Sequence, residues 1–224
     1  MENIESISFS GGGWVGMYYY IGVLRYITQK YPDQQFITLG ASAGALISTI
    51  LQLIQHNFTT LEKFEQDLEV FEKSVAHFPI FLEKRIKKFC DDFIQLSNKD
   101  FVQFNHKLYV SYTQRKTIFL ENMLINPISI NQLKEILIFS SMMPILVGIN
   151  FSRMDGFFSN NQPVLNEKTL KINCIYSYGA DISPSEWINP VDIFRIPSQE
   201  KKDYLIKMGY HDISAYFESK NTLK

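Results

Sequence analysis

Residues 36–46 read Phe-Ile-Thr-Leu-Gly-Ala-Ser-Ala-Gly-Ala-Leu, a short apolar run that breaks into a Gly-x-Ser-x-Gly turn. The run predicts a buried strand, and the apolar spacing after the turn predicts a buried helix. Gly40 and Gly44 lack side chains where such a strand and helix pack closely, so the turn can present Ser42 as a nucleophile. The pattern is short, and alone it also fits an ordinary serine in a glycine-rich turn.

A second glycine-rich turn lies between a strand predicted at residues 4–9 and a helical pattern. Its three consecutive glycines are Gly11, Gly12 and Gly13. Their backbone N–H groups lie at the positive end of a helix, where they can bind an anion. With Gly16 they match the fingerprint of dinucleotide sites, but no acidic residue follows the next strand to bind a ribose. We therefore interpret the turn as a site for the oxyanion that forms when Ser42 attacks a carbonyl.

Composition and charge narrow the functional classes. The chain has 224 residues, 46% of them hydrophobic, which is enough for one sizeable core, and we expect a single domain over residues 1–224. Its 22 basic and 23 acidic residues give a net charge of −1, so no overall field attracts nucleic acid. Cys90 and Cys174 show neither metal-ligand spacing nor a disulfide framework. We expect buried free thiols and no metal site.

The relation of the chain to a membrane depends on two observations. No apolar signal segment follows the acidic N-terminus, and no apolar run is long enough for a transmembrane helix. We expect an intracellular protein, either cytoplasmic or attached peripherally to a membrane. A helix predicted at residues 79–96 carries phenylalanines and isoleucines beside Lys84, Arg85, Lys87 and Lys88. This helix either packs on the core with a solvated basic side, which is the commoner arrangement, or lies on anionic lipid headgroups.

The remaining segments alternate helical and strand patterns. Helices are predicted at residues 59–76, 79–96, 129–140, 198–208 and 212–219. Strands are predicted at residues 107–113, 117–120, 149–153 and 171–178. Gly209 has the position of a residue that closes the helix before it. The pair Asp155-Gly156 heads a polar segment rich in small residues, and alone it is typical of a turn.

Taken in order, these motifs resemble the patatin-like phospholipase family over residues 6 to about 217. The segments that carry the resemblance are the oxyanion loop Gly11 to Gly16, the nucleophile elbow Gly40 to Gly44, the helix end Ser140 to Pro144, the Asp155-Gly156 pair and the continuation Asn160 to Pro163. Residues 13–23 resemble the animal branch that includes adipose triglyceride lipase. Two residues depart from the family pattern. Phe157 replaces its second glycine or alanine, and Val15 stands where many members carry arginine or lysine.

The resemblance implies a three-layer α/β/α fold with a mainly parallel central sheet and a Ser-Asp dyad without histidine. In such a site Asp155 takes the proton of Ser42, which attacks an acyl ester. The implied oxyanion donors are the backbone N–H groups of Gly11, Gly12, Gly13 and Ala43. No cofactor or metal is implied. The implied function is a serine acyl hydrolase that releases fatty acids from glycerolipid esters at a membrane or lipid-droplet surface.

Two alternatives stay open. In the first, Ser42, Asp155 and His211 form the triad of an α/β-hydrolase, whose chain order they match. Against it, one strand and one helix precede the elbow, and His211 lies in a sequence typical of a helix end. In the second, the chain is a lipid-binding relative without turnover, because Phe157 narrows the site. The choice among phospholipid, triacylglycerol and lysolipid, and the oligomeric state, do not follow from the sequence.

Overall fold

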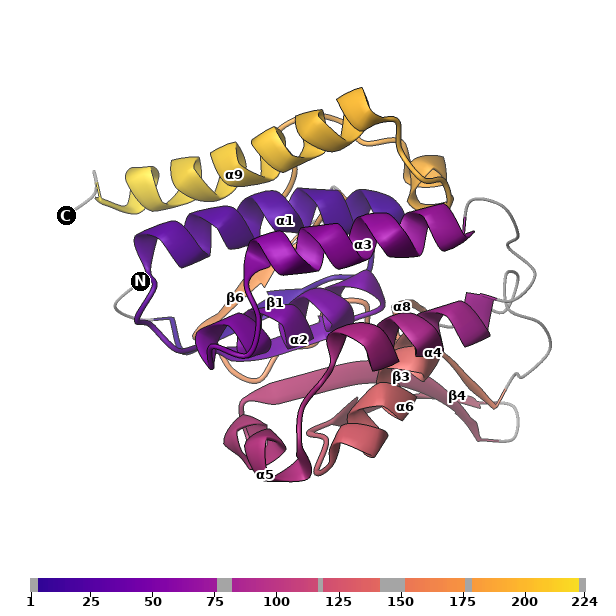
Figure 1. Ribbon diagram of the computed structural model, residues 1–224. Helices are drawn as coiled ribbons and strands as arrows, with labels where there is room; N and C mark the ends of the chain where they lie inside the picture. The colour runs from indigo at the N-terminus through magenta and orange to yellow at the C-terminus, as the bar shows by residue number, and fades with distance from the viewer. Residues whose placement is uncertain (1–3, 76–81, 117–118, 142–151, 176–178, 222–224) are drawn as a thin grey trace.

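The computed structural model describes residues 4–75, 82–116, 119–141, 152–175 and 179–221 (Figure 1). The strands are β1 (Ser6–Phe9), β2 (Ile37–Ala41), β3 (Leu108–Lys116), β4 (Phe119–Ile125), β5 (Arg153–Asp155) and β6 (Thr169–Ile172). The α-helices are α1 (Gly13–Lys30), α2 (Ala43–Gln55), α3 (Leu61–Val75), α4 (Leu82–Phe93), α5 (Asn98–Phe101), α6 (Ile130–Ser140), α8 (Phe157–Asn160) and α9 (Gln199–Asn221). Two short 3₁₀ helices are η2 (Val102–Phe104) and η3 (Pro190–Phe194).

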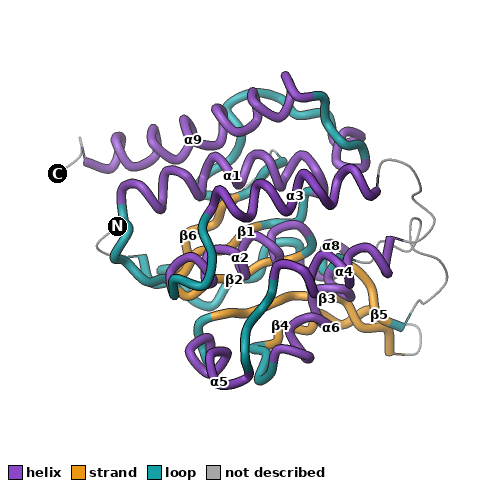
Figure 2. The backbone as a smooth tube through the Cα atoms, in the orientation of Figure 1, coloured by secondary structure: helices purple, strands orange, loops and turns teal. Residues whose placement is uncertain are grey.

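The strands form one sheet in the order β4-β3-β2-β1-β6, and β5 also pairs with β3 (Figure 2). The neighbours from β6 to β3 run parallel, whereas β4 and β5 run antiparallel to β3. Helices cover both faces, which gives the three-layer α/β/α patatin-like fold with a mainly parallel sheet that the sequence predicts. The carboxyl ends of parallel strands meet at one edge, so the turns after β1 and β2 emerge side by side.

Helix α9 packs along α1 (Figures 1 and 2), and two glycines set how closely they approach. A Cβ on Gly22 of α1 would lie 2.0 Å from the Ile206 carbonyl oxygen, and a Cβ on Gly209 of α9 would lie 2.0 Å from that of Tyr19. The predicted helix end at Gly209 is therefore wrong. Helix α9 continues without a break because this glycine serves close helix packing, not capping.

The strand predictions hold in outline and differ at their ends. Residues 114–116, predicted as a connection, extend β3, because the β3–β4 ladder continues to the pair Lys116 and Phe119. Strand β6 ends at Ile172, ahead of the predicted end. Strand β5 covers only the last residue of the strand predicted at 149–153, and residues 149–151 lie outside the described part of the chain.

Helix α4 resolves the question of the basic segment. Its apolar residues Ile86 and Phe89 are buried in the core with Cys90, while Lys88 is exposed and pairs with Asp92 at 2.6 Å. The core-packing interpretation of this helix is therefore confirmed. The predicted helix start at Pro79 lies outside the described residues.

Two further observations concern the sequence predictions about thiols and membrane spans. Cys90 and Cys174 are free and buried, as expected. Among the residues described, no helix combines the length and the apolar character that crossing a bilayer requires.

Candidate active site

Ser42 occupies the sharp turn between β2 and α2. Its backbone has φ 54° and ψ −127°, a conformation that residues with a side chain rarely adopt and that costs about 1–3 kcal/mol. The two flanking glycines make the turn possible. A Cβ on Gly40 would lie 2.1 Å from the Gly44 carbonyl oxygen, and a Cβ on Gly44 would lie 2.2 Å from that of Phe9. The strand and helix therefore pack as closely as the glycine spacing predicts.

Ser140, the last residue of α6, holds this turn in place. The Ser42 backbone N–H donates to Ser140 Oγ at 2.8 Å, and Ser140 Oγ donates to the Ser111 carbonyl oxygen at 2.6 Å. Ser140 is fully buried, so both bonds are shielded from water. Sequence reasoning treated Ser140 only as part of a helix end. Its hydrogen-bond partners lie far away in the chain, so a serine at this position does not by itself predict them.

The sheet register brings Asp155 to Ser42. Strand β2 pairs with β3 up to Ala41 opposite Ser111, and β5 pairs with the same edge of β3 up to Asp155 opposite Tyr112. The two strands thus meet end to end. The residue after Asp155 must be a glycine, because a Cβ on Gly156 would lie 2.5 Å from the Ser111 carbonyl oxygen. The Asp-Gly pair is a requirement of this junction as well as a turn.

The Asp155 carboxyl is buried, with 1% of the residue exposed. Burial raises the pKa of Asp155 from 3.8 to about 7, and hydrogen bonds from the Ser42 side chain and the Phe157 backbone N–H lower it in part. The Phe157 N–H lies 2.9 Å from Asp155 Oδ1. A carboxylate with a pKa near neutrality, hydrogen-bonded to a serine hydroxyl, has the properties of a general base.

The glycine loop supplies backbone donors beside Ser42. Gly13 and Ala43 are the first residues of α1 and α2, where backbone N–H groups have no partner inside the helix. The Gly11 N–H instead donates to Asn161 Oδ1 at 2.8 Å. Gly11 is therefore removed from the set of oxyanion donors that the sequence suggests, because its N–H is already bonded. Asn161, whose position sequence reasoning did not explain, ties the loop to the segment after Asp155.

Cys174 packs under the glycine loop and explains two of its glycines. A Cβ on Gly12 would lie 1.9 Å from Cys174 Sγ, and a Cβ on Gly16 would lie 2.9 Å from it. The Sγ atom also lies 3.6 Å from the Gly11 carbonyl oxygen. The motif glycines of this loop thus serve close packing against a buried thiol.

An apolar cavity of about 110 Å³ opens from Ser42 between α1, α2, α3 and α4. Its apolar lining residues are Trp14, Met17, Ala43, Leu46, Phe71, Ile86, Ile193 and Phe194. A smaller space of about 30 Å³ lies on the side of Phe157 and Ile175. Phe157 lines this smaller space, does not line the apolar cavity, and is 43% exposed. An apolar cavity that reaches a serine hydroxyl can accommodate an apolar ligand.

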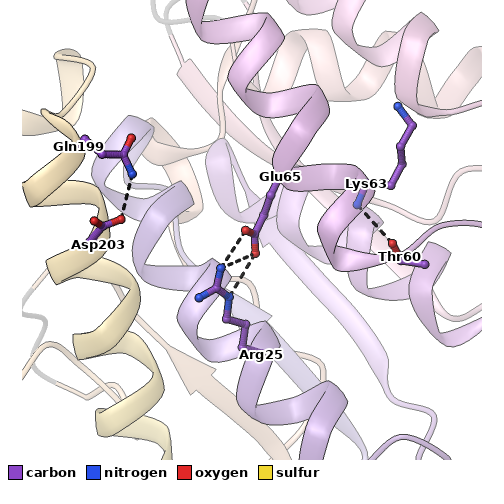
Figure 3. A network of polar contacts seen from close by, with 6 residues as sticks. All are labelled: Arg25, Thr60, Lys63, Glu65, Gln199 and Asp203. Carbon is purple, nitrogen blue, oxygen red and sulfur yellow. Dashed lines mark hydrogen bonds and ion pairs between the residues drawn. The ribbon is translucent and has the colours of Figure 1, made fainter.

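A larger cavity of about 430 Å³ lies away from Ser42, between α1, α3 and α9. Figure 3 shows part of its lining: Arg25 of α1 reaches Glu65 of α3, with 2.8 Å between Arg25 Nη2 and Glu65 Oε2, and Gln199 contacts Asp203 on α9. This cavity is lined largely by ionisable side chains. Such a lining does not suit an apolar ligand, so the apolar cavity that contains Ser42 is the candidate site.

The structure does not bring His211 to this site. His211 lies within α9, its side chain is 74% exposed, and its Nδ1 atom lies 3.4 Å from Asp212 Oδ1. It lines neither of the two cavities that contain Ser42. The geometry therefore favours the dyad over the triad.

Comparison with known proteins gives a likeness to solved structures but not to known sequences. The sequence matches no protein-family profile, and it matches no curated protein sequence. Among solved structures, the chain is similar to VipD from Legionella pneumophila, with a TM-score of 0.55 and 13% sequence identity over 97% of this chain and 67% of that one. At this identity the likeness concerns the fold alone, and it fits the patatin-like arrangement of the sheet and helices.

Proposed function

We propose that this chain is a serine acyl hydrolase of the lipase or phospholipase A type, which releases fatty acids from glycerolipid esters. The observation that carries the proposal is the pairing of Ser42, in a strained and half-buried turn, with the buried carboxyl of Asp155. The cavity beside them is apolar, as an acyl substrate requires. The patatin-like fold agrees with this function.

The reaction follows from these positions in two halves. Asp155 accepts the Ser42 proton while Ser42 Oγ attacks the ester carbonyl carbon, and the N–H groups of Gly12, Gly13 and Ala43 stabilise the oxyanion. The tetrahedral intermediate then expels the alcohol, which takes the proton from Asp155. Water next gives a proton to Asp155 and attacks the acyl-enzyme, and Ser42 recovers its proton as the fatty acid leaves.

Exposed aromatic side chains near the site support a lipid surface as the partner. Phe157 and Phe158 are 43% and 42% exposed and form a perpendicular pair with ring centroids 6.0 Å apart. Val191 and Phe194 of η3 are also exposed, and Phe194 lines the apolar cavity. We propose that this face, and not α4, meets the membrane or lipid droplet.

The test is fatty-acid release from phospholipid vesicles and, in parallel, from an emulsion of a short-chain triacylglycerol. Wild type releases fatty acid from at least one of them, and Ser42→Ala does not. Ser214→Ala is the matched control, because Ser214 lies on α9 and its hydroxyl bonds Glu218 at 2.8 Å. Absence of release by a folded wild-type chain would contradict the proposal and favour the lipid-binding alternative.

A further inference from the structure

Phe71 of α3 stands between two cavities. It lines the apolar cavity of about 110 Å³ that contains Ser42. It also lines a second cavity of about 160 Å³ between α3 and α4, which shares no other lining residue with the first. The rest of the lining of the second cavity combines apolar and polar residues: Val70, Phe89, Asp67, Ser74, Lys88 and Asp92. Lys88 and Asp92 form an ion pair at 2.6 Å.

The ring contacts of Phe71 place it as the partition. On the side of Ser42, the Phe71 ring meets Trp14, with ring centroids 5.6 Å apart. On the other side it stacks on Phe89, with centroids 4.6 Å apart. Trp14 lines only the first cavity and Phe89 only the second. An acyl chain that extends from Ser42 therefore meets the Phe71 ring before it reaches the second cavity.

The volume of the first cavity sets how much of that chain it can enclose. An apolar cavity of about 150 Å³ accommodates a benzene ring. By that measure the first cavity, of about 110 Å³, takes roughly four to five carbon atoms. The second cavity is larger than the first, so its opening would more than double the space for an acyl chain.

We infer that Phe71 determines the acyl-chain length that this site accepts, so that the chain favours short acyl groups. The inference rests on the proposed hydrolase function, and it names the substrate class within it. Replacement of Phe71 by a small residue joins the two cavities and admits longer acyl groups, whose far ends lie along Val70 and Phe89.

The experiment compares p-nitrophenyl esters from butanoate to hexadecanoate with wild type, Phe71→Ala, Phe71→Leu and Phe64→Ala. Phe64 is the matched control: it is a buried phenylalanine of α3 that lines neither cavity. For wild type, kcat/KM falls by about tenfold or more between butanoate and dodecanoate. Phe71→Ala removes most of that fall, Phe71→Leu removes part of it, and Phe64→Ala keeps the wild-type ratio.

Two results would overturn the inference: equal use of butanoate and dodecanoate by wild type, or the same change of ratio in Phe71→Ala and Phe64→Ala. A readout without turnover separates this inference from the proposed function. Binding of fatty acids to Ser42→Ala is followed by the fluorescence of Trp14, which lines the first cavity. Adding Phe71→Ala to Ser42→Ala lowers the Kd of dodecanoate relative to that of butanoate, even if no ester is hydrolysed. An unchanged ratio of the two Kd values contradicts the inference.

Discussion

Ser42 and Asp155 lie next to each other because β2 and β5 meet along the same edge of β3. Ala41, the residue before Ser42, pairs with Ser111, and Asp155 pairs with the neighbouring Tyr112. This register fixes the distance between the proposed nucleophile and the proposed base through the sheet, because both strands are bonded to the same partner strand. A site built on strand ends is held more precisely than one built on long loops. The pairing depends on Gly156, since a side chain there would collide with the β3 backbone.

The raised pKa of Asp155 predicts the pH profile of ester hydrolysis. The Asp155 carboxyl must be ionised to act as the base, and its pKa in the free enzyme is about 7. We expect kcat/KM for a soluble butanoate ester to rise with pH and to level off above a midpoint near 7. The measurement is a profile from about pH 5 to pH 9. A profile that is flat over this range, or already level at pH 5, would exclude Asp155 as the titrating base.

Asp155→Asn is expected to abolish hydrolysis and to stabilise the fold at alkaline pH. The folded pKa of Asp155 lies above its unfolded value of 3.8, so the unfolded chain loses this proton first as pH rises. Wild-type stability therefore falls between about pH 4 and pH 7, by up to roughly 4 kcal/mol, and stays lower above pH 7. Denaturant unfolding at pH 5 and pH 8 tests this. Asp155→Asn must raise the free energy of unfolding more at pH 8 than at pH 5. An equal increase at the two pH values would contradict the argument that burial raises the pKa of Asp155.

Ser140→Ala is expected to lower kcat more than it changes KM. The substitution leaves the Ser42 N–H without its buried acceptor, which costs about 1–3 kcal/mol and loosens the nucleophile turn. Ser129→Ala is the control on the same helix, because Ser129 caps α6 through the Gln132 N–H and its loss costs about 1 kcal/mol. If both variants lower kcat equally, Ser140 acts only through the stability of α6.

Glu72→Ala is expected to destabilise the fold strongly. Glu72 is buried, and its carboxylate accepts hydrogen bonds from the Tyr18 hydroxyl and from Lys202 Nζ. Its removal leaves the largely buried Lys202 ammonium without this partner, at a cost of about 3–5 kcal/mol. Denaturant unfolding measures the loss. Glu72→Gln keeps an acceptor oxygen and the volume but removes the charge, so it should cost less than Glu72→Ala and still destabilise the fold. A Glu72→Gln variant as stable as wild type would refute the ion-pair account.

The local motifs were predictable from the sequence, because the turn at Ser42 is determined by its flanking Gly40 and Gly44. The approach of Asp155 to Ser42 was expected only from the family resemblance and not from any local pattern, since it depends on the pairing of β5 with β3. Ser140 accepts a hydrogen bond from Ser42, and Asn161 accepts one from Gly11. The partners lie far apart in the sequence, so the residue types alone do not predict these contacts.

Glycine was the most ambiguous residue for prediction. At Gly209 the sequence indicated a helix end, but the structure uses the glycine for close contact with α1. The same property, a missing side chain, serves both purposes. The face that α4 presents to the core was ambiguous for a similar reason, because an amphipathic pattern does not say which surface it covers.

The most direct test of the central claim is the site of reaction with a fluorophosphonate, which forms a covalent adduct with an activated serine. Mass mapping after exposure of the folded chain should find one adduct on the peptide that contains Ser42. Ser42→Ala should carry none, and Asp155→Asn should react far more slowly. A folded wild-type chain that forms no adduct, or forms it at another serine, would contradict the assignment of Ser42 as the nucleophile.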